Sequence, residues 1–296
     1  MPWPNWQQAA SLTVVMLLLA AAAKRWGNRR GPSVAAGATE IALVSFLYML
    51  WRLARVLPLV QDEGAVERGH QVWRFQQWLH LPSELAIERW TLHHRWLAEF
   101  AVSFYATAHV PALLGFLVWL YVRHKPDYPR WRNALVITTG FCLFIRFVRV
   151  APPRLLPDLG FVDMSNVLHK SVYGPVGTGV SDQFAAMPSI HIAWAAIVCF
   201  GVLQASPSRW RIIGPVHLAL TFFAVVATAN HWWMDGIVAI GLMVIALGLD
   251  WAARRLRAAH RRMPVPAIEA GVEPAPETVL EPAAAEPAVA APVLTD

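Results

Sequence analysis

The chain is built from long apolar runs that are separated by shorter polar connections. With a window of about 19 residues, the apolar runs fall near residues 8–23, 39–59, 99–122, 134–150, 188–204, 211–229 and 234–252. Runs of this kind are typical of transmembrane helices. The pattern therefore predicts an all-α fold, a polytopic membrane helical bundle of about six to seven transmembrane helices. The first run is short, and an uncleaved signal-like segment is the alternative for it.

Two regions lie outside the apolar runs. Residues 62–98 mix aromatic and charged side chains, and Pro82 divides them, which predicts two amphipathic helices in the outer membrane interface. A lid over a lipid-facing site is the alternative. Residues 263–296 are rich in Pro, Ala, Glu and Val, which predicts a disordered cytoplasmic tail. Residues 1–38 would then hold an N-terminal span and a cytoplasmic loop, and residues 39–253 the main transmembrane domain.

Composition and charge agree with a membrane protein, since 56% of the residues are hydrophobic and only 15% are charged. Most Lys and Arg residues cluster in alternate connections, which the positive-inside rule places in the cytoplasm. Residues 151–187 and the connection that holds His231 would then face outward, in what we expect to be the plasma membrane. The basic clusters set topology and contact anionic lipids rather than nucleic acid. Cys142 and Cys199 lie inside apolar runs and are expected to be buried hydrophobes.

Two short motifs carry the strongest chemical signal. His191 and His231 each stand at the start of an apolar run, 40 positions apart. That spacing equals about two membrane helices of roughly 20 residues, so a chain that crosses and returns brings both histidines to one membrane face. Asp235 follows His231 by one helical turn. Together they predict phosphoryl transfer through a phosphohistidine. The alternative is a pair of membrane-edge histidines and an Asp that starts a helix.

Three arginines, Arg146, Arg149 and Arg154, stand at the outer end of the fourth apolar run. An arginine at membrane depth is costly, so it generally has a functional partner or reaches to the interface. Guanidinium groups offer forked donors and a permanent charge to phosphate oxygens. We expect Arg146 and Arg154 to bind phosphate, and Arg149 to join them unless it only anchors the helix end.

A family resemblance rests on three stretches: Ala151-Pro-Pro-Arg154, Ala185-Ala-Met-Pro-Ser189-Ile-His191 and Asn230-His231-Trp-Trp-Met-Asp235. They resemble the signature motifs of the type-2 phosphatidate phosphatase superfamily, which also holds acid phosphatases and haloperoxidases. More closely, they resemble its inositol-phosphorylceramide synthase-like branch, as does the stretch from Glu84 to His109. The resemblance covers about residues 40–252 and implies a phosphatase-type core of six helices.

The resemblance implies a metal-independent reaction without a cofactor. His231 would be the nucleophile, and Asp235 would hold the far nitrogen of its ring. His191 would protonate the leaving group and then deprotonate the acceptor. The phosphate would be held by Arg146, Arg154 and Ser189.

The sequence departs from the superfamily pattern at two positions. That pattern has a Lys before the first-motif Arg and an Arg before the nucleophilic His, where this chain has Phe147 and Val225. The phosphate site thus lacks one usual cation. Asn230 or His109 would supply donors instead, although a buried core histidine is the alternative for His109.

Three classes of function remain open. The first is a phosphotransferase that moves a phosphoinositol or sugar-phosphate head group onto a lipid or glycan hydroxyl. The second is a lipid phosphate phosphatase, with water as acceptor and a polyprenyl or phosphatidyl phosphate as donor. The third is a non-enzymatic scaffold or transporter, which would not need two histidines and an aspartate together. The expected partners are a lipid-linked phosphate and the membrane lipids, without nucleic acid.

Overall fold

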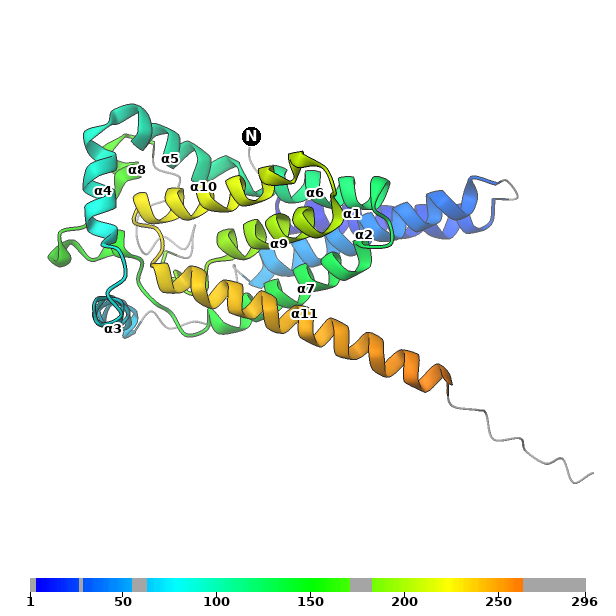
Figure 1. The fold of residues 1–296 in the computed structure, drawn as a ribbon. Coiled ribbons are helices and arrows are strands. Elements are labelled where there is room, and N and C mark those ends of the chain that lie inside the picture. The colour runs from blue at the N-terminus through cyan, green and yellow to red at the C-terminus, as the bar shows by residue number, and fades with distance from the viewer. Residues whose placement is uncertain (1–3, 27–28, 55–62, 171–182, 263–296) are drawn as a thin grey trace, which may run out of the picture. The chain divides into compact units, whose positions relative to one another are not determined.

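The computed structural model describes residues 4–26, 29–54, 63–170 and 183–262, and these residues form helices and connections without a strand. Residues Met1–Arg254 make up one compact unit. Figure 1 shows the order of its helices along the chain. The expected tail, residues 263–296, lies outside the described residues. The all-α prediction is confirmed.

The longer helices are α1 (Trp6–Lys24), α2 (Gly31–Ala54), α3 (Ala65–Trp78), α4 (Glu84–His93), α5 (Arg95–Thr107), α6 (His109–Arg123), α7 (Tyr128–Ile145), α9 (Ile190–Ala205), α10 (Ile213–Ala227) and α11 (Trp233–Arg262). The described part of the connection between α7 and α9 contains three short helical turns, η1 (Pro153–Leu155), η2 (Pro157–Leu159) and α8 (Met164–Val167). A further turn, η3 (Arg209–Ile212), leads directly into α10.

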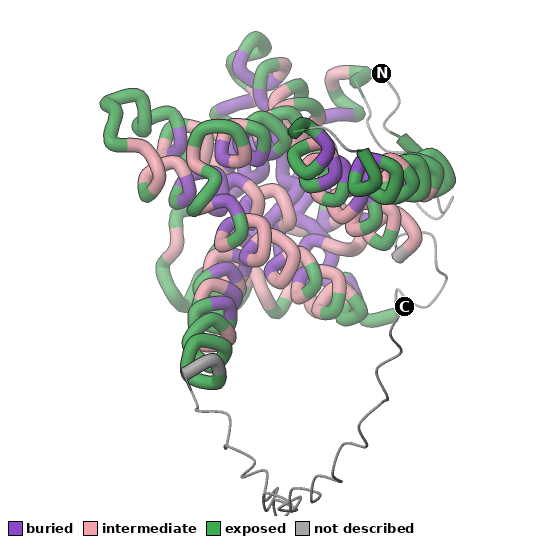
Figure 2. The backbone as a smooth tube through the Cα atoms, turned by 90° about the vertical axis from the view of Figure 1, so that its right-hand side faces the viewer, coloured by how far each residue is buried: buried purple, intermediate pink, exposed green. Residues whose placement is uncertain are grey.

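Helix α9 forms the centre of the helical core and packs against α6, α7 and α10. Figure 2 shows the buried backbone gathered in this interior. Close packing continues at the start of α11, where a Cβ on Gly236 would lie 2.5 Å from the Phe222 ring and 2.6 Å from Ile192. Because glycine has no side chain, α11 can approach α9 and α10 closely beside Asp235.

Helix bounds differ from the sequence expectation at three places. Helix α2 begins at Gly31 rather than near residue 39, so the loop after α1 is shorter than expected. The expected span at 99–122 consists of α5 and α6, which are bent by 51° at Ala108. Helix α7 ends at Ile145 rather than near residue 150. An irregular segment follows and leads to Pro152 and Pro153, which cannot continue a helix.

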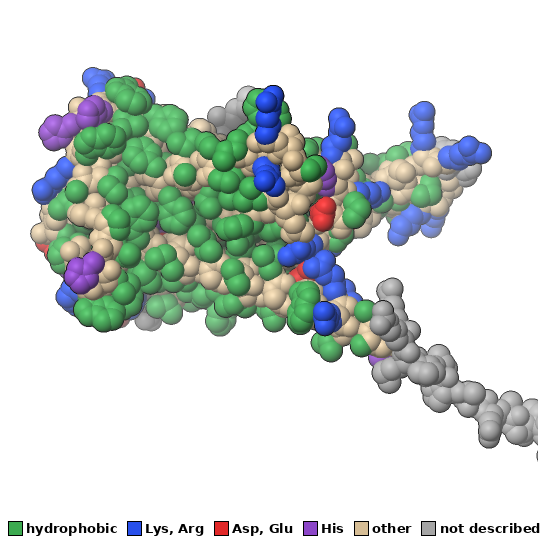
Figure 3. Space-filling model, viewed as in Figure 1, with side chains coloured by type: hydrophobic (Ala, Val, Ile, Leu, Met, Phe, Trp, Pro, Cys, Tyr) green, Lys and Arg blue, Asp and Glu red, His purple; other side chains and the backbone are tan. Residues whose placement is uncertain are grey.

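Within the part of the chain that the structure describes, four helices are long and apolar enough to cross a membrane: α1, α2, α10 with η3, and α11. The bent pair α5–α6 makes five. Helix α9 is a shorter apolar helix, and α7 is not among the candidates, so the count of six to seven stays a prediction. Figure 3 shows hydrophobic side chains over the middle of one face, with Lys, Arg and His toward its ends. These helices support an integral membrane protein.

The two amphipathic helices expected on either side of Pro82 are present as α3 and α4. Their position at a membrane interface stays a prediction. Three of their polar side chains, Gln76, Glu84 and Glu88, are buried in the protein, each 1% exposed. The helices are therefore packed onto the rest of the fold through polar contacts as well as apolar ones.

Candidate functional site

The three motif segments are tied together by backbone hydrogen bonds. The amide of Arg154 donates to the carbonyl of Ala229 over 2.9 Å, which joins the first motif to the third. The amide of Ala186 donates to Val150 over 3.1 Å, which joins the second motif to the first. The amide of Ser189 donates to the backbone carbonyl of Asp235 over 3.2 Å, which joins the second motif to the third. Segments that are far apart in sequence thus form one frame.

The end of α10 sets the position of the third motif. The amide of Asn230 donates to Val225 over 3.0 Å, and the amide of Ala229 donates to Val226 over 2.9 Å. These two bonds form a Schellman motif, whose C′ residue takes the left-handed conformation. Ala229 occupies that position with φ of 53°. The sharp reversal carries the chain from α10 directly into His231.

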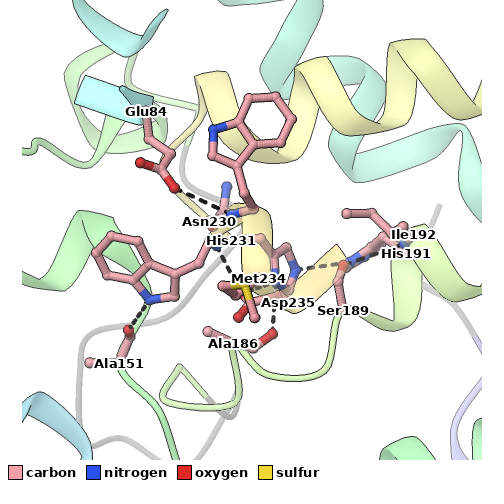
Figure 4. Close-up of polar contacts among 12 residues, drawn as sticks. Glu84, Ala151, Ala186, Ser189, His191, Ile192, Asn230, His231, Met234 and Asp235 are labelled. Atoms are coloured by element: carbon pink, nitrogen blue, oxygen red, sulfur yellow. Dashed lines mark hydrogen bonds and ion pairs between the residues drawn. The ribbon is translucent and has the colours of Figure 1, made fainter. Parts of the chain in front are cut away.

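The ring of His231 is held at one nitrogen by two acceptors (Figure 4). Its Nδ1 lies 2.8 Å from the carbonyl oxygen of Ala186 and 3.1 Å from Oδ2 of Asp235. Because both partners are acceptors, Nδ1 carries the proton, and Nε2 keeps its lone pair. Asp235 is fully buried, and its Oδ2 also accepts from the amide of Trp232 over 2.9 Å.

His191 faces Nε2, the unprotonated ring nitrogen of His231. The distance from His191 Nδ1 to His231 Nε2 is 3.4 Å. His191 lies in the first turn of α9, where Ser189 Oγ caps the helix by accepting from the amide of Ile192 over 3.4 Å. The amides of such a first turn, together with the helix dipole, favour an anion. Ser189 is buried behind the histidine rather than on the cavity wall.

Arg154 is held in the site by three side chains. Its side chain is buried, its Nε donates to Oδ1 of Asn230 over 2.9 Å, and its Nη1 donates to Asp163 and Gln183, each over 3.2 Å. The amide group of Asn230 donates in turn to Oγ1 of Thr228 over 2.7 Å. Asn230 thus orients Arg154. Asp163 and Gln183 were not predicted as site residues, because their role depends on the fold of the connection.

One cavity of about 480 Å³ is lined by Arg154 and by its partners Gln183 and Asn230. Its wall includes both histidines and three arginines, Arg52, Arg146 and Arg154. Arg149 is not on this wall; its backbone carbonyl accepts from Arg68 Nε. Arg52 comes from α2 and was not predicted from the sequence, where it reads only as a cation near the end of an apolar run.

Aromatic side chains form much of the remaining wall. The ring of His109, at the bend between α5 and α6, lies 4.6 Å from that of His191, centroid to centroid, at 69°. The Tyr105 ring lies 4.6 Å from the same imidazole. From α2, Tyr48 and Trp51 also line the cavity. His109 is therefore both buried and part of the site, and its contact with His191 orients that ring.

A buried carboxylate, Glu88, lies near Asp163, which accepts a hydrogen bond from Arg154. Glu88 Oε1 accepts from the amide of Val162 over 3.2 Å, and Oε2 has no hydrogen-bond partner among the described residues. Burial raises the pKa of Glu88 to about 7, the bond from Val162 opposes the rise, and the charge of Asp163 adds to it. The Glu88 carboxyl group thus binds its proton more tightly in the folded protein than in the unfolded chain.

We expect Glu88→Gln to make stability less dependent on pH. Stabilisation from the raised pKa is present below the unfolded value of 4.5 and is lost as pH rises through about 7. The variant should therefore unfold at a higher temperature than wild type at pH 8, by roughly 4 °C, and near the wild-type temperature at pH 4.5. Thermal unfolding followed by circular dichroism measures this. Glu67→Gln, on the exposed face of α3, is the control, and an equal shift at both pH values would contradict the assignment.

Among the described residues, no group of three or more His, Cys, Asp or Glu side chains could hold a metal ion. Cys142 and Cys199 are both buried and free. The chain has no match among curated proteins or among solved structures. A family model described as the PAP2 superfamily matches residues 70–249, which include all three motifs. The chain belongs to the PAP2 superfamily, and this membership supports phosphatase- or phosphotransferase-type activity on phosphate esters.

Proposed function

We propose that the protein is an integral-membrane phosphotransferase that moves a head-group phosphate from one lipid-linked ester to another hydroxyl through a phosphohistidine. One observation carries the proposal. His231 has its Nδ1 fixed by Ala186 and Asp235, and its Nε2 faces His191 at 3.4 Å on the wall of a cavity. That is the arrangement of an activated nucleophile beside an acid–base group.

In the first half-reaction, Nε2 of His231 attacks the phosphorus of the donor. The bond from phosphorus to the leaving oxygen breaks, and that oxygen keeps the electron pair and takes a proton from His191. The ring of His231 then carries a positive charge, which the buried carboxylate of Asp235 stabilises. No metal ion takes part in this scheme.

In the second half-reaction, His191 takes the proton of the acceptor hydroxyl as its oxygen attacks the phosphorus. The bond between phosphorus and Nε2 breaks, and both histidines return to their starting states. Arg146 and Arg154 neutralise the phosphate oxygens. Arg52 adds a third cation, which offsets the one usual cation that the phosphate site lacks.

The size of the cavity favours transfer of a head group. At about 480 Å³ it falls within the range of small-molecule sites, which is larger than one phosphate needs. Aromatic rings on its wall, Tyr48, Trp51, Tyr105 and Trp194, can cover the face of a polyol ring. The synthase-like motifs point the same way. Hydrolysis of a lipid phosphate is the second candidate, because water can replace the acceptor hydroxyl without any change of residue.

Transfer and hydrolysis can be separated with one labelled donor. We expect the purified protein in nanodiscs to move the labelled phosphoinositol group from phosphatidylinositol to an added ceramide, with diacylglycerol as the leaving group, giving a new lipid phosphodiester on thin-layer chromatography. The reaction should persist in excess chelator and stop with vanadate, which mimics pentacoordinate phosphorus. Release of water-soluble label alone would favour the phosphatase, and strict dependence on a divalent cation would contradict the phosphohistidine scheme.

We also propose that the site faces away from the cytoplasm, because the basic clusters lie in the connections at the other membrane side. Reporter fusions after Gly160 and after Lys125 should therefore report opposite sides, with Gly160 outside. A cytoplasmic signal at Gly160 would overturn the orientation and leave the chemistry untouched.

A further inference from the structure

The start of α11 is held by side chains from other helices. The amide of Trp233 donates to Oε1 of Glu84 over 3.3 Å, and the amide of Met234 donates to Oε1 of Gln76 over 2.9 Å. The first amides of a helix lack partners inside it, and a residue just before the helix normally supplies one. In this helix, α3 and α4 supply two acceptors across the fold, and Figure 4 shows the one from Glu84.

The two capping side chains also fix each other. Gln76 Nε2 donates to Oε1 of Glu84 over 2.7 Å. Because its amide nitrogen faces a carboxylate, the oxygen of Gln76 must face Met234, and the group has one orientation only. The indole nitrogen of Trp233 adds a bond of 2.8 Å to the carbonyl of Pro82, between α3 and α4.

His231 and Asp235 both lie at this start of α11. His231 precedes α11 by two residues, and Asp235 lies in its first turn. The carboxylate of Glu84 lies at the N-terminus of α11, which is the positive end of the helix dipole. Asp235 lies in the first turn at the same end. Burial raises the pKa of Glu84, the bonds from Trp233 and Gln76 oppose the rise, and the nearby charge of Asp235 adds to it.

We propose that Glu84 and Gln76 are positioning residues for the phosphoryl-transfer reaction: they dock α3 and α4 onto the first turn of α11 and thereby set the geometry of His231 and Asp235. Neither side chain lines the cavity, so their effect passes through the helix. A displacement of about 1 Å at a nucleophile can lower turnover by about 10²-fold. This inference rests on the proposed role of His231.

The test compares Gln76→Leu and Glu84→Leu with the matched control Glu67→Leu, which changes an exposed carboxylate on α3. We expect kcat to fall by about 10–100-fold in the first two variants, with KM within about twofold. Glu84→Gln keeps an acceptor for the amide of Trp233 and should recover most of the loss. An unchanged kcat in both folded Leu variants, or a rise in KM alone, would overturn the proposal.

A second readout does not need turnover. In protein labelled with ¹⁵N-histidine, the His231 ring signals are identified by their loss in His231→Ala. They should move in Glu84→Leu and Gln76→Leu and stay in place in Glu67→Leu. If wild type has no turnover but these signals move, the proposed function fails and the docking role stands. If they do not move, the docking role fails by itself.

Milder variants cover the case in which the leucine variants do not fold. Glu84→Asp and Gln76→Asn each shorten the side chain by one methylene and withdraw the acceptor from its helix amide. We expect them to unfold near the wild-type temperature, yet to show reduced kcat and displaced His231 signals. Wild-type values for both would overturn the proposal.

Discussion

Replacing His231 by alanine is expected to remove the covalent intermediate and to lower turnover by about 10⁴-fold or more. The reason is the geometry of its ring: Nδ1 is fixed by Ala186 and Asp235, and Nε2 is the nitrogen that faces the cavity. No other side chain in the described part of the chain has both features. Rapid quench with a labelled donor should trap acid-labile, base-stable phosphate on wild type only.

His191→Ala should behave differently, because a general acid contributes about 10²–10⁴-fold and matters most for poor leaving groups. A nitrophenyl phosphate, whose leaving group needs no proton, should recover much of the loss in this variant and none in His231→Ala. His93→Ala, on the exposed surface of α4, is the control. Label retained by His231→Ala would assign the nucleophile elsewhere, with His191 the next candidate.

Asp235→Asn is expected to lower kcat by about 10²-fold with little change in KM. One oxygen, Oδ2, accepts from both His231 and Trp232, and Oδ1 has no partner among the described residues. An asparagine can therefore keep both hydrogen bonds and place its amide nitrogen at the other position. The carbonyl of Ala186 still requires a proton on Nδ1, so the tautomer is kept and the loss reports the missing charge.

Steady-state kinetics and trapping on the two variants at this position separate charge from geometry. Asp235→Ala removes the acceptor as well, so it should lose about tenfold more than the asparagine variant. Labelled phosphate should still appear on Asp235→Asn, at a lower level than on wild type. Near-wild-type turnover in Asp235→Asn, with the loss confined to Asp235→Ala, would mean that the hydrogen bonds, rather than the charge, explain the role of Asp235.

The proximity of His191 and His231 could be predicted from the sequence because the signals for it are local. His191 and His231 stand at helix starts, and the distance between them along the chain corresponds to a crossing and a return. Asp235 follows from the helical repeat alone. Arg154 was predicted from its place after two prolines, although the structure ends α7 earlier, at Ile145, and places Arg154 in η1.

The rest of the site depends on packing that periodicity does not encode. The bend at Ala108 brings His109 onto His191, whereas hydropathy alone reads one continuous span. Arg52 reaches the cavity only because α2 packs beside the core. Glu84 looks like the start of an amphipathic helix, and its bond to the amide of Trp233 joins residues 149 positions apart.

The frame that joins the three motifs is made of main-chain groups, such as the bond from Arg154 to Ala229 and the bond from Ser189 to Asp235. Main-chain bonds survive a change of side chain. Inactive variants such as His231→Ala should therefore keep the shape of the cavity and still bind the lipid without reacting with it. They are suited to capturing the natural lipid from a membrane extract for identification by mass spectrometry.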